Sequence, residues 1–194
     1  MSADNFHDAF NSDVGFFVNY CKMKGPFSTE DVDLTVREYI RFLLTKSGRF
    51  SFHLRLADSI KLAWLKTFYF GLINHFYNSD LSSQAFFGRE LYFPHPFSLV
   101  IGTGVILSGR IIIFNDVTLG KMRPGTVDGM PQVKLNVILC VGCRVIGETT
   151  INEDSVVAAN AVVASDVGPQ ATIFANGKIT DRVYWQNLQI IEKV

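Results

Sequence analysis

Aliphatic residues recur every six positions through the middle of the chain. The first row comprises Ile101, Leu107, Ile113 and Leu119, and a second row four residues into each unit comprises Val105, Ile111 and Val117. Helices repeat every 3.6 residues and half-buried strands every two, so neither accounts for this spacing. A six-residue repeat is typical of a β-solenoid, in which each unit supplies one short strand and one corner. The pattern therefore predicts a β-helix.

The same period resumes after a break at residues 121–132. The later first row comprises Val133, Leu139, Val145, Ile151, Val157 and Val163, and the later second row comprises Val137, Cys143, Thr149, Ser155, Ala161 and Val167. About three units complete a triangular coil, and stacked coils bury both rows. The break predicts a loop extruded from a corner, and unstructured loops of this length are usually functional.

Upstream, the repeat runs out of phase by two residues. Leu81, Phe87 and Phe93 keep the six-residue spacing, and the two phases meet at Pro94-His95-Pro96. A histidine therefore lies where the repeat slips, which makes His95 the first candidate for chemistry.

The N-terminal third has helical spacing instead. Three helices are expected. The first covers residues 3–22, the second begins at a cap at Ser28 or Thr29 and ends at Gly48, and the third covers about Phe52 to Tyr77. The last of these is rich in aromatic residues. The aromatic residues of this helix favour packing in the core and between subunits. The alternative is a peripheral membrane face, with Arg55, Lys61 and Lys66 near lipid headgroups.

The expected fold class is mainly β with α: a parallel β-helix preceded by an N-terminal helical region. The expected domains are a helical region at 1–78, a β-helix at 79–180 with its extruded loop at 121–132, and a tail at 181–194.

Composition narrows the functional classes. Apolar residues make up 48% of the chain and charged residues 19%, as in a globular protein. Eighteen basic residues balance eighteen acidic ones, so no nucleic-acid partner is indicated. Three cysteines and the lack of a signal-like start favour a cytoplasmic location. No stretch is long and apolar enough to span a bilayer.

These units, the segment NDVTLG and the run VVAANAVVASDV resemble hexapeptide-repeat acyltransferases. The helical start, an aspartate fifteen residues before a histidine, and the LVIG and VTLG segments resemble the serine acetyltransferase superfamily. The resemblance covers about residues 78–180. It implies a left-handed parallel β-helix, a homotrimer, acetyl-CoA as co-substrate bound between neighbouring β-helices, and no metal.

Acetyl transfer to a hydroxyl needs a base, and histidine suits that role near neutral pH. By resemblance, His95 matches the catalytic histidine, and Asp80 matches the carboxylate that orients it. Wedging between prolines to shape a corner is the structural alternative for His95, and a turn or cap is the alternative for Asp80.

The acceptor positions depart from the resemblance. Serine acetyltransferases carry an acidic residue before the catalytic histidine and an Arg-His pair at the end of the loop, where this chain has Pro94, Gly129 and Met130. A zwitterionic serine would lack its charged partners there. The expected acceptor is therefore a neutral hydroxyl on a small molecule or glycan, namely on a sugar of a surface polysaccharide or its precursor. In this respect the chain resembles the sugar and polysaccharide O-acetyltransferase sub-branch.

For the donor, the resemblance implies backbone contacts from the later coils and cations near the phosphates. The matching positions are Gly120, Lys121, Cys140, Val141, Gly142, Ala158, Ala159, Asn160, Arg123 and Lys178. Small residues at these corners, and solvated lysines, are also expected of the solenoid alone.

Three rival functions remain: serine acetylation for cysteine biosynthesis, transfer with another acyl donor or to an amine, and a non-catalytic trimeric scaffold. The Cys140–Cys143 pair lacks the second pair or the redox context that a metal or disulfide site needs. Cys143 is therefore expected to face inward, and His53 and His75 are expected to be structural.

Overall fold

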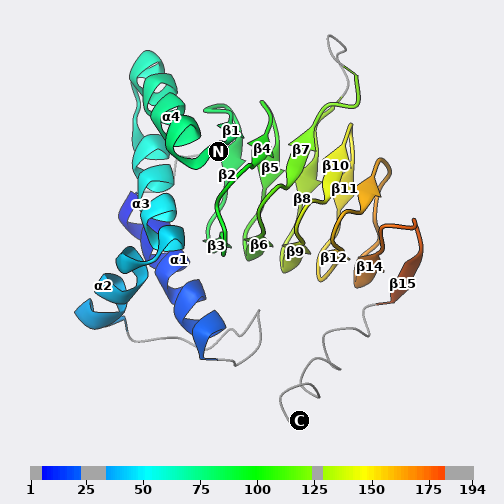
Figure 1. Cartoon of the computed structure of the whole chain (residues 1–194), viewed down its shortest axis with the longest axis horizontal. Coiled ribbons are helices and arrows are strands. Elements are labelled where there is room, and N and C mark those ends of the chain that lie inside the picture. The colour runs from blue at the N-terminus through cyan, green and yellow to red at the C-terminus, as the bar shows by residue number, and fades with distance from the viewer. Residues whose placement is uncertain (1–5, 23–33, 124–128, 182–194) are drawn as a thin grey trace.

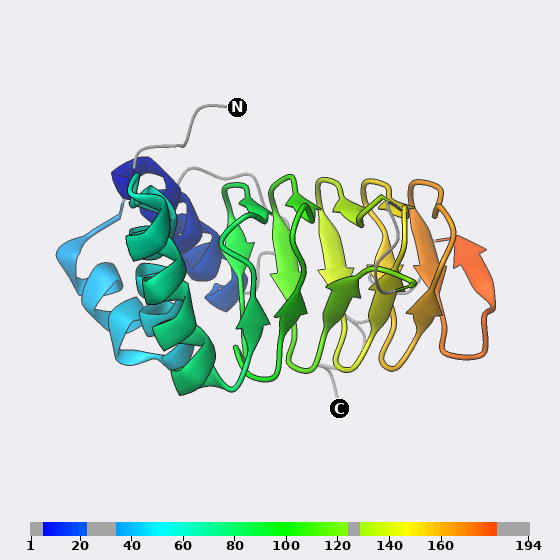
Figure 2. The same cartoon turned by 90° about the horizontal axis from the view of Figure 1, so that it is seen from above.

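The computed structural model describes residues 6–22, 34–123 and 129–181, and shows four helices at one end of a stacked coil of short strands (Figures 1 and 2). The helices are α1 (Phe6–Cys21), α2 (Val36–Leu44), α3 (Lys46–Ser59) and α4 (Ala63–Tyr77). The strands are β1 (Asp80–Leu81), β2 (Phe86–Phe87), β3 (Leu91–Tyr92), β4 (Val100–Ile101), β5 (Ile106–Leu107), β6 (Ile111–Ile113), β7 (Thr118–Gly120), β8 (Gln132–Val133), β9 (Val137–Leu139), β10 (Arg144–Ile146), β11 (Thr150–Ile151), β12 (Val156–Val157), β13 (Val162–Val163), β14 (Ala171–Ile173) and β15 (Ile179–Asp181).

The strands form the three parallel sheets of a left-handed β-helix, which confirms the predicted fold class. Sheet A has the order β1-β4-β7-β10-β13, sheet B the order β11-β8-β5-β2, and sheet C the order β15-β14-β12-β9-β6-β3. The antiparallel pair β14–β15 ends sheet C.

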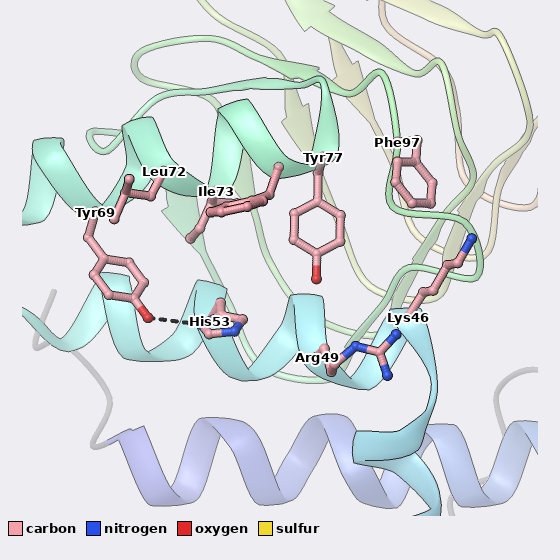
Figure 3. Close-up of a pocket in the computed structure, with 9 residues that line it drawn as sticks. Lys46, Arg49, His53, Tyr69, Leu72, Ile73, Tyr77 and Phe97 are labelled. Atoms are coloured by element: carbon pink, nitrogen blue, oxygen red, sulfur yellow. Dashed lines mark hydrogen bonds between the residues drawn. The ribbon is translucent and has the colours of Figure 1, made fainter.

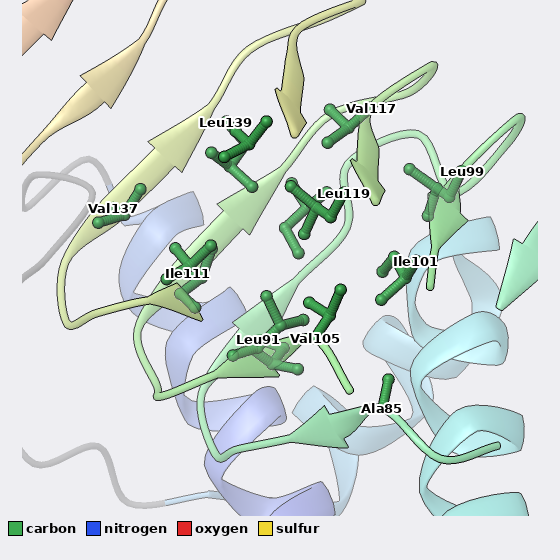
Figure 4. Close-up of a cluster of buried hydrophobic side chains, with 14 of the residues drawn as sticks. Ala85, Leu91, Leu99, Ile101, Val105, Ile111, Val117, Leu119, Val137 and Leu139 are labelled. Atoms are coloured by element: carbon green, nitrogen blue, oxygen red, sulfur yellow. The ribbon is translucent and has the colours of Figure 1, made fainter. Parts of the chain in front are cut away.

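Both predicted aliphatic rows face the interior of the coil. Every member of the rows from Val105 to Val167 is buried, as are Leu81, Phe87 and Phe93 upstream. Figure 4 shows the rows converging between the three sheets, with Leu99, Val117 and Leu119 pointing into the same core as Leu91 and Ile111. This burial is the main stabilising contribution to the coil, at about 25 cal/mol for each Å² of apolar surface removed from water.

The phase slip is a corner enlarged by two residues. Sheet A pairs Asp80 with Val100, twenty positions on, but pairs Val100 with Thr118, eighteen positions on. The two extra residues lie between Phe93 and Leu99, both fully buried, so the corner that carries His95 is larger than the next one along the coil.

The helical boundaries differ from the sequence prediction. The helix expected over residues 3–22 is present as α1, which is described from Phe6 to Cys21. The expected cap at Ser28 or Thr29 lies outside the described residues, and α2 is capped by Thr35 in a capping box with Glu38. The expected stop at Gly48 is wrong: Gly48 lies inside α3, where a Cβ would overlap the carbonyl group of Phe42.

The expected single aromatic helix is two helices, because α3 ends at Ser59 and α4 begins at Ala63. On α4, Phe70 is buried, whereas Trp64, Phe68 and Phe76 are at least 60% exposed. Core packing of one chain therefore accounts for only one side of this helix. In the part of the chain that the structure describes, no helix has the length and apolar character needed to cross a bilayer.

A buried ion pair joins the helices to the first coil. Arg55 Nε and Nη2 donate to the two carboxylate oxygens of Asp13 at 2.8 Å, and the same guanidinium donates to the carbonyls of Phe87 and Gly88. The Leu91 amide donates to Asp13 Oδ1. Arg55 is 2% exposed, so its suggested place near lipid headgroups is wrong. The reason is that its charge is matched inside the protein.

The base of the extruded loop is compact where it is described. Lys121, Met122 and Arg123 are exposed, residues 124–128 lie outside the described residues, and Met130 packs against the core cluster. The expected C-terminal tail lies outside the described residues from 182 onward.

Candidate active site

The corners that join sheet C to sheet A stack into one edge of the β-helix. We call this the C–A edge; it comprises residues 94–98, 114–116, 140–142 and 158–160. The residues of this edge with left-handed backbone are Ser98, Asp116, Gly142 and Asn160. The amides of Asp116, Gly142 and Asn160 each donate to a carbonyl of the preceding corner at 3.0 to 3.1 Å. The Ser98 amide donates to the Tyr77 carbonyl at the end of α4 at 3.3 Å. This ladder aligns the corners in a single file along the solenoid axis.

His95 lies on this edge with its side chain exposed. Its carbonyl accepts a hydrogen bond from the Phe97 amide at 2.8 Å, which folds the enlarged corner back on itself. Its ring lies 6.4 Å from the ring of Phe114 in the next coil. The imidazole is therefore open to a substrate and backed by an aromatic ring.

Asp80 begins β1 one coil before the enlarged corner. Its amide donates to the Leu99 carbonyl at 2.7 Å, and its side chain is exposed. It lines a cavity of about 480 Å³ together with His75, Ser98 and Asp116. No hydrogen bond or ion pair joins Asp80 to His95 within the described part of the chain, so the orienting role of Asp80 stays a prediction. Sequence reasoning did not anticipate Asp116 or His75 here.

Six of the predicted donor residues lie on the C–A edge: Cys140, Val141, Gly142, Ala158, Ala159 and Asn160. Val141 and Gly142 lie in one corner, and Ala158 and Ala159 lie in the corner of the next coil. The Ala158 amide donates to the Ile173 carbonyl of β14. Lys178 follows in the hairpin between β14 and β15, where its carbonyl accepts from the Phe174 amide. The edge thus carries a histidine in an early coil and a lysine beyond the last one.

Gly120 and Lys121 lie elsewhere. Strand β7 runs from the C–A edge to the corner that joins sheets A and B, so Gly120 and Lys121 lie at the far side of sheet A from His95. Within a single chain, the predicted donor residues therefore fall on two edges.

Gly129 and Met130, where the chain differs from serine acetyltransferases, are closely packed at the base of the extruded loop. A Cβ on Gly102 would lie 2.7 Å from the Met130 methyl group, and a Cβ on Gly129 would lie 2.5 Å from Glu148 Cγ. Met130 thus covers the backbone of an earlier coil. Glu148, which sequence reasoning missed, is the charged residue beside Gly129.

The cysteine pair has the surroundings of structural thiols. Cys143 is fully buried and Cys140 partly so. Burial raises the pKa of the Cys140 thiol to about 11 and also raises that of Cys143. Because the thiolate is the reactive form, both side chains are inert at neutral pH.

Gly142→Ala is expected to lower the free energy of unfolding by about 1–3 kcal/mol, because Gly142 has a φ of +70° and a Cβ would overlap the Asn160 side chain. Urea unfolding measures the change. Gly168→Ala is the matched control, since a Cβ there meets nothing within 4 Å. Equal effects of the two changes would show that the corner does not require glycine.

Comparisons with known proteins point to one family. A putative serine acetyltransferase from Schizosaccharomyces pombe is 34% identical over 93 residues, which are 48% of this chain and 34% of that protein. The Bacillus subtilis serine acetyltransferase is 29% identical over 164 residues, covering 81% of this chain and 73% of that protein. No protein-family model matches the chain.

Solved structures share the fold at lower identity. The Neisseria gonorrhoeae serine acetyltransferase superposes with a TM-score of 0.75 at 20% identity, covering 97% of this chain and 71% of that one. The Brucella abortus serine acetyltransferase in complex with coenzyme A gives 0.72 at 20% identity, covering 91% and 68%.

The chain therefore shares the left-handed β-helix fold of these solved serine acetyltransferases. In sequence it is similar to proteins named as serine acetyltransferases. The relatives named here are not sugar O-acetyltransferases, so the narrower expectation of that sub-branch gains no support from them.

Proposed function

We propose that the protein is an acetyl-CoA-dependent O-acetyltransferase with His95 as its general base. The imidazole takes the proton from the acceptor hydroxyl while the oxygen attacks the thioester carbonyl. Collapse of the tetrahedral adduct forms the ester and breaks the C–S bond, and the imidazolium returns its proton to the departing thiolate. The exposed position of His95 on an edge lined by small residues is the observation that carries this proposal.

The C–A edge also suits the donor in shape. From the His95 corner to the Lys178 hairpin there are four coil steps of about 4.8 Å, or roughly 19 Å, which is comparable to an extended pantetheine arm with its pyrophosphate. Gly142 and the two alanines admit the arm close to the backbone. Lys178 lies where it can pair with the phosphates. A relative solved with coenzyme A supports acetyl-CoA as co-substrate.

A homotrimer would bring the two groups of donor residues together. We propose a three-fold assembly with parallel coil axes, in which the C–A edge of one β-helix would lie beside sheet A of its neighbour. Gly120 and Lys121 of the neighbour would then face the donor held along the C–A edge. Sedimentation equilibrium at the concentration of the activity assay tests this part of the proposal. A fully active protein that is monomeric under those conditions would contradict it.

L-serine is the acceptor that the relatives support better than a sugar, since they are named serine acetyltransferases. A sugar hydroxyl is the second candidate. Pro94, Gly129 and Met130 favour it, because none of them can pair with the carboxylate or ammonium group of serine.

A thiol-release assay with acetyl-CoA distinguishes the acceptors. We expect release with L-serine, and compare it with nucleotide sugars and neutral oligosaccharides at equal concentration. Thiol release with a saccharide and none with serine would show that the acceptor is a sugar hydroxyl. No release with any hydroxyl acceptor would contradict O-acetyl transfer and favour a scaffold.

Asp80→Asn is expected to lower kcat roughly ten- to a hundredfold, the equivalent of a hydrogen bond to a charged group worth about 1.5–3 kcal/mol. The loss would come from an imidazolium without its carboxylate. Asp116→Asn is the control from the same cavity, since Asp116 already pairs with Arg144 at 3.3 Å. A lower kcat in Asp116→Asn, with kcat unchanged in Asp80→Asn, would show that Asp116 and not Asp80 orients the imidazole.

A further inference from the structure

A cavity of about 550 Å³ lies between α3 and α4, away from the donor residues (Figure 3). Its walls are mostly apolar and aromatic: Tyr69, Leu72, Ile73, Phe76, Tyr77 and Phe97. Cavities of this size, mostly apolar and with a few polar groups, are typical of small-molecule sites. The helices leave this space instead of closing over it.

The two ends of the cavity differ in charge. Figure 3 shows Lys46 and Arg49 at the end near Phe97, and His53 hydrogen-bonded to the Tyr69 hydroxyl at the other end, at 2.8 Å. Lys46 Nζ lies 5.3 Å from the centre of the Phe97 ring. The exposed ammonium group therefore lies near an aromatic wall of the cavity.

The cations at this end have no acidic partner among the described residues. Arg49 Nη1 donates to the Leu44 carbonyl at 2.8 Å, which holds the guanidinium in place and leaves its charge unmatched. Within the described part of the chain, neither Lys46 nor Arg49 forms an ion pair. From Ser59 to Ser79, which includes all of α4, the sequence has no aspartate or glutamate. The cavity is therefore apolar along its length and positive at one end.

We propose that this cavity binds a monomeric amphipathic anion, an alkyl or aryl group that ends in a phosphate or a carboxylate. The apolar part lies along Tyr69, Ile73 and Phe76, and the anion pairs with Lys46 and Arg49 through charge-assisted hydrogen bonds. A neutral ligand of the same shape would remove water from Lys46 and Arg49 without offering them a charged partner, and this desolvation is unfavourable.

The orientation relates this site to the rest of the molecule. The anionic end of the ligand lies beside Phe97, two residues after His95 in the enlarged corner. A bound anion therefore reaches the corner that carries His95 while leaving the donor residues from Val141 to Ala159 free. The site does not depend on the identity of the acceptor.

Isothermal titration calorimetry with octyl phosphate, kept below its micelle-forming concentration, tests the ligand class. We expect one site per chain and at least tenfold weaker binding of 1-octanol, which has the same chain and no charge. Equal binding of the two, or no binding of either, would overturn the proposal.

Matched variants locate the site. Lys46→Gln with Arg49→Gln is expected to weaken octyl phosphate at least tenfold, and Lys61→Gln with Arg37→Gln removes the same charge at exposed positions outside the cavity. Phe76→Ser should weaken binding, whereas Phe68→Ser, on the same exposed side of α4 but outside the lining, should not. Equal losses in both members of either pair would overturn the proposal.

A lipid surface is the competing source of the same chemistry. Vesicles of phosphatidylglycerol in phosphatidylcholine are tested by co-sedimentation with the same four variants. Vesicle binding that depends on Phe68 as strongly as on Phe76, with no binding of monomeric octyl phosphate, would show that the face contacts a membrane and that the cavity is not a ligand site.

Discussion

His95→Ala is expected to lower kcat for acetyl transfer by about 10²–10⁴-fold, the usual contribution of a positioned general base. The hydroxyl would then have to lose its proton to water while the oxygen attacks. The measurement is initial-rate thiol release with acetyl-CoA and the acceptor found in the screen.

Two controls separate chemistry from structure. The side chain of His95 is exposed, so the alanine variant should unfold at the same urea concentration as the parent protein. His7→Ala removes another exposed histidine, on α1, and should leave kcat unchanged. Unchanged turnover in His95→Ala, with the fold intact, would show that His95 is not the base.

Arg55→Met is expected to lower the free energy of unfolding by about 3–5 kcal/mol, because it leaves the Asp13 carboxylate buried without its partner. Both side chains are almost fully buried, at 2% and 0% exposure. The carbonyls of Phe87 and Gly88 lose their donors as well. Urea unfolding followed by circular dichroism measures the change.

Arg37→Met is the control, since Arg37 is exposed on α2 and its loss should change stability by less than about 0.5 kcal/mol. The double change Asp13→Leu with Arg55→Met should destabilise the protein less than the sum of the single changes, because no charge is left buried. A loss of under about 1 kcal/mol for Arg55→Met would contradict a role for this pair in joining the helices to the coil.

The coil could be predicted because its signal is periodic and local. Each six-residue unit repeats the same inward positions, so the burial of Val105, Leu107 and Ile111 follows from spacing alone. The two-residue change of phase could also be predicted from the sequence. The structure places the two extra residues in the corner that carries His95.

The arrangement of the helices could not be predicted in the same way. Asp13 and Arg55 are 42 positions apart, and no periodic pattern relates them. The sequence allows Arg55 to be grouped with Lys61 and Lys66 on a membrane face, because basic residues beside aromatic ones are typical of such a face. Its actual partner became visible only through tertiary structure.

The candidate site was predicted in part. Spacing and resemblance singled out His95, Val141, Gly142 and Ala158, which share the C–A edge. The same reasoning could not show that Gly120 lies across sheet A, because the number of residues between corners does not reveal which edge each corner joins. Nor could it reveal Asp116 beside Asp80, since a corner aspartate is common in any solenoid.

A crystal structure of the complex with coenzyme A tests the central claim most directly. We expect the thiol end beside His95 and the arm along the C–A edge past Gly142 and Ala158, with the phosphates toward Lys178. Coenzyme A bound away from the C–A edge, with its sulfur far from His95, would contradict the proposed site and the role of His95 as the base.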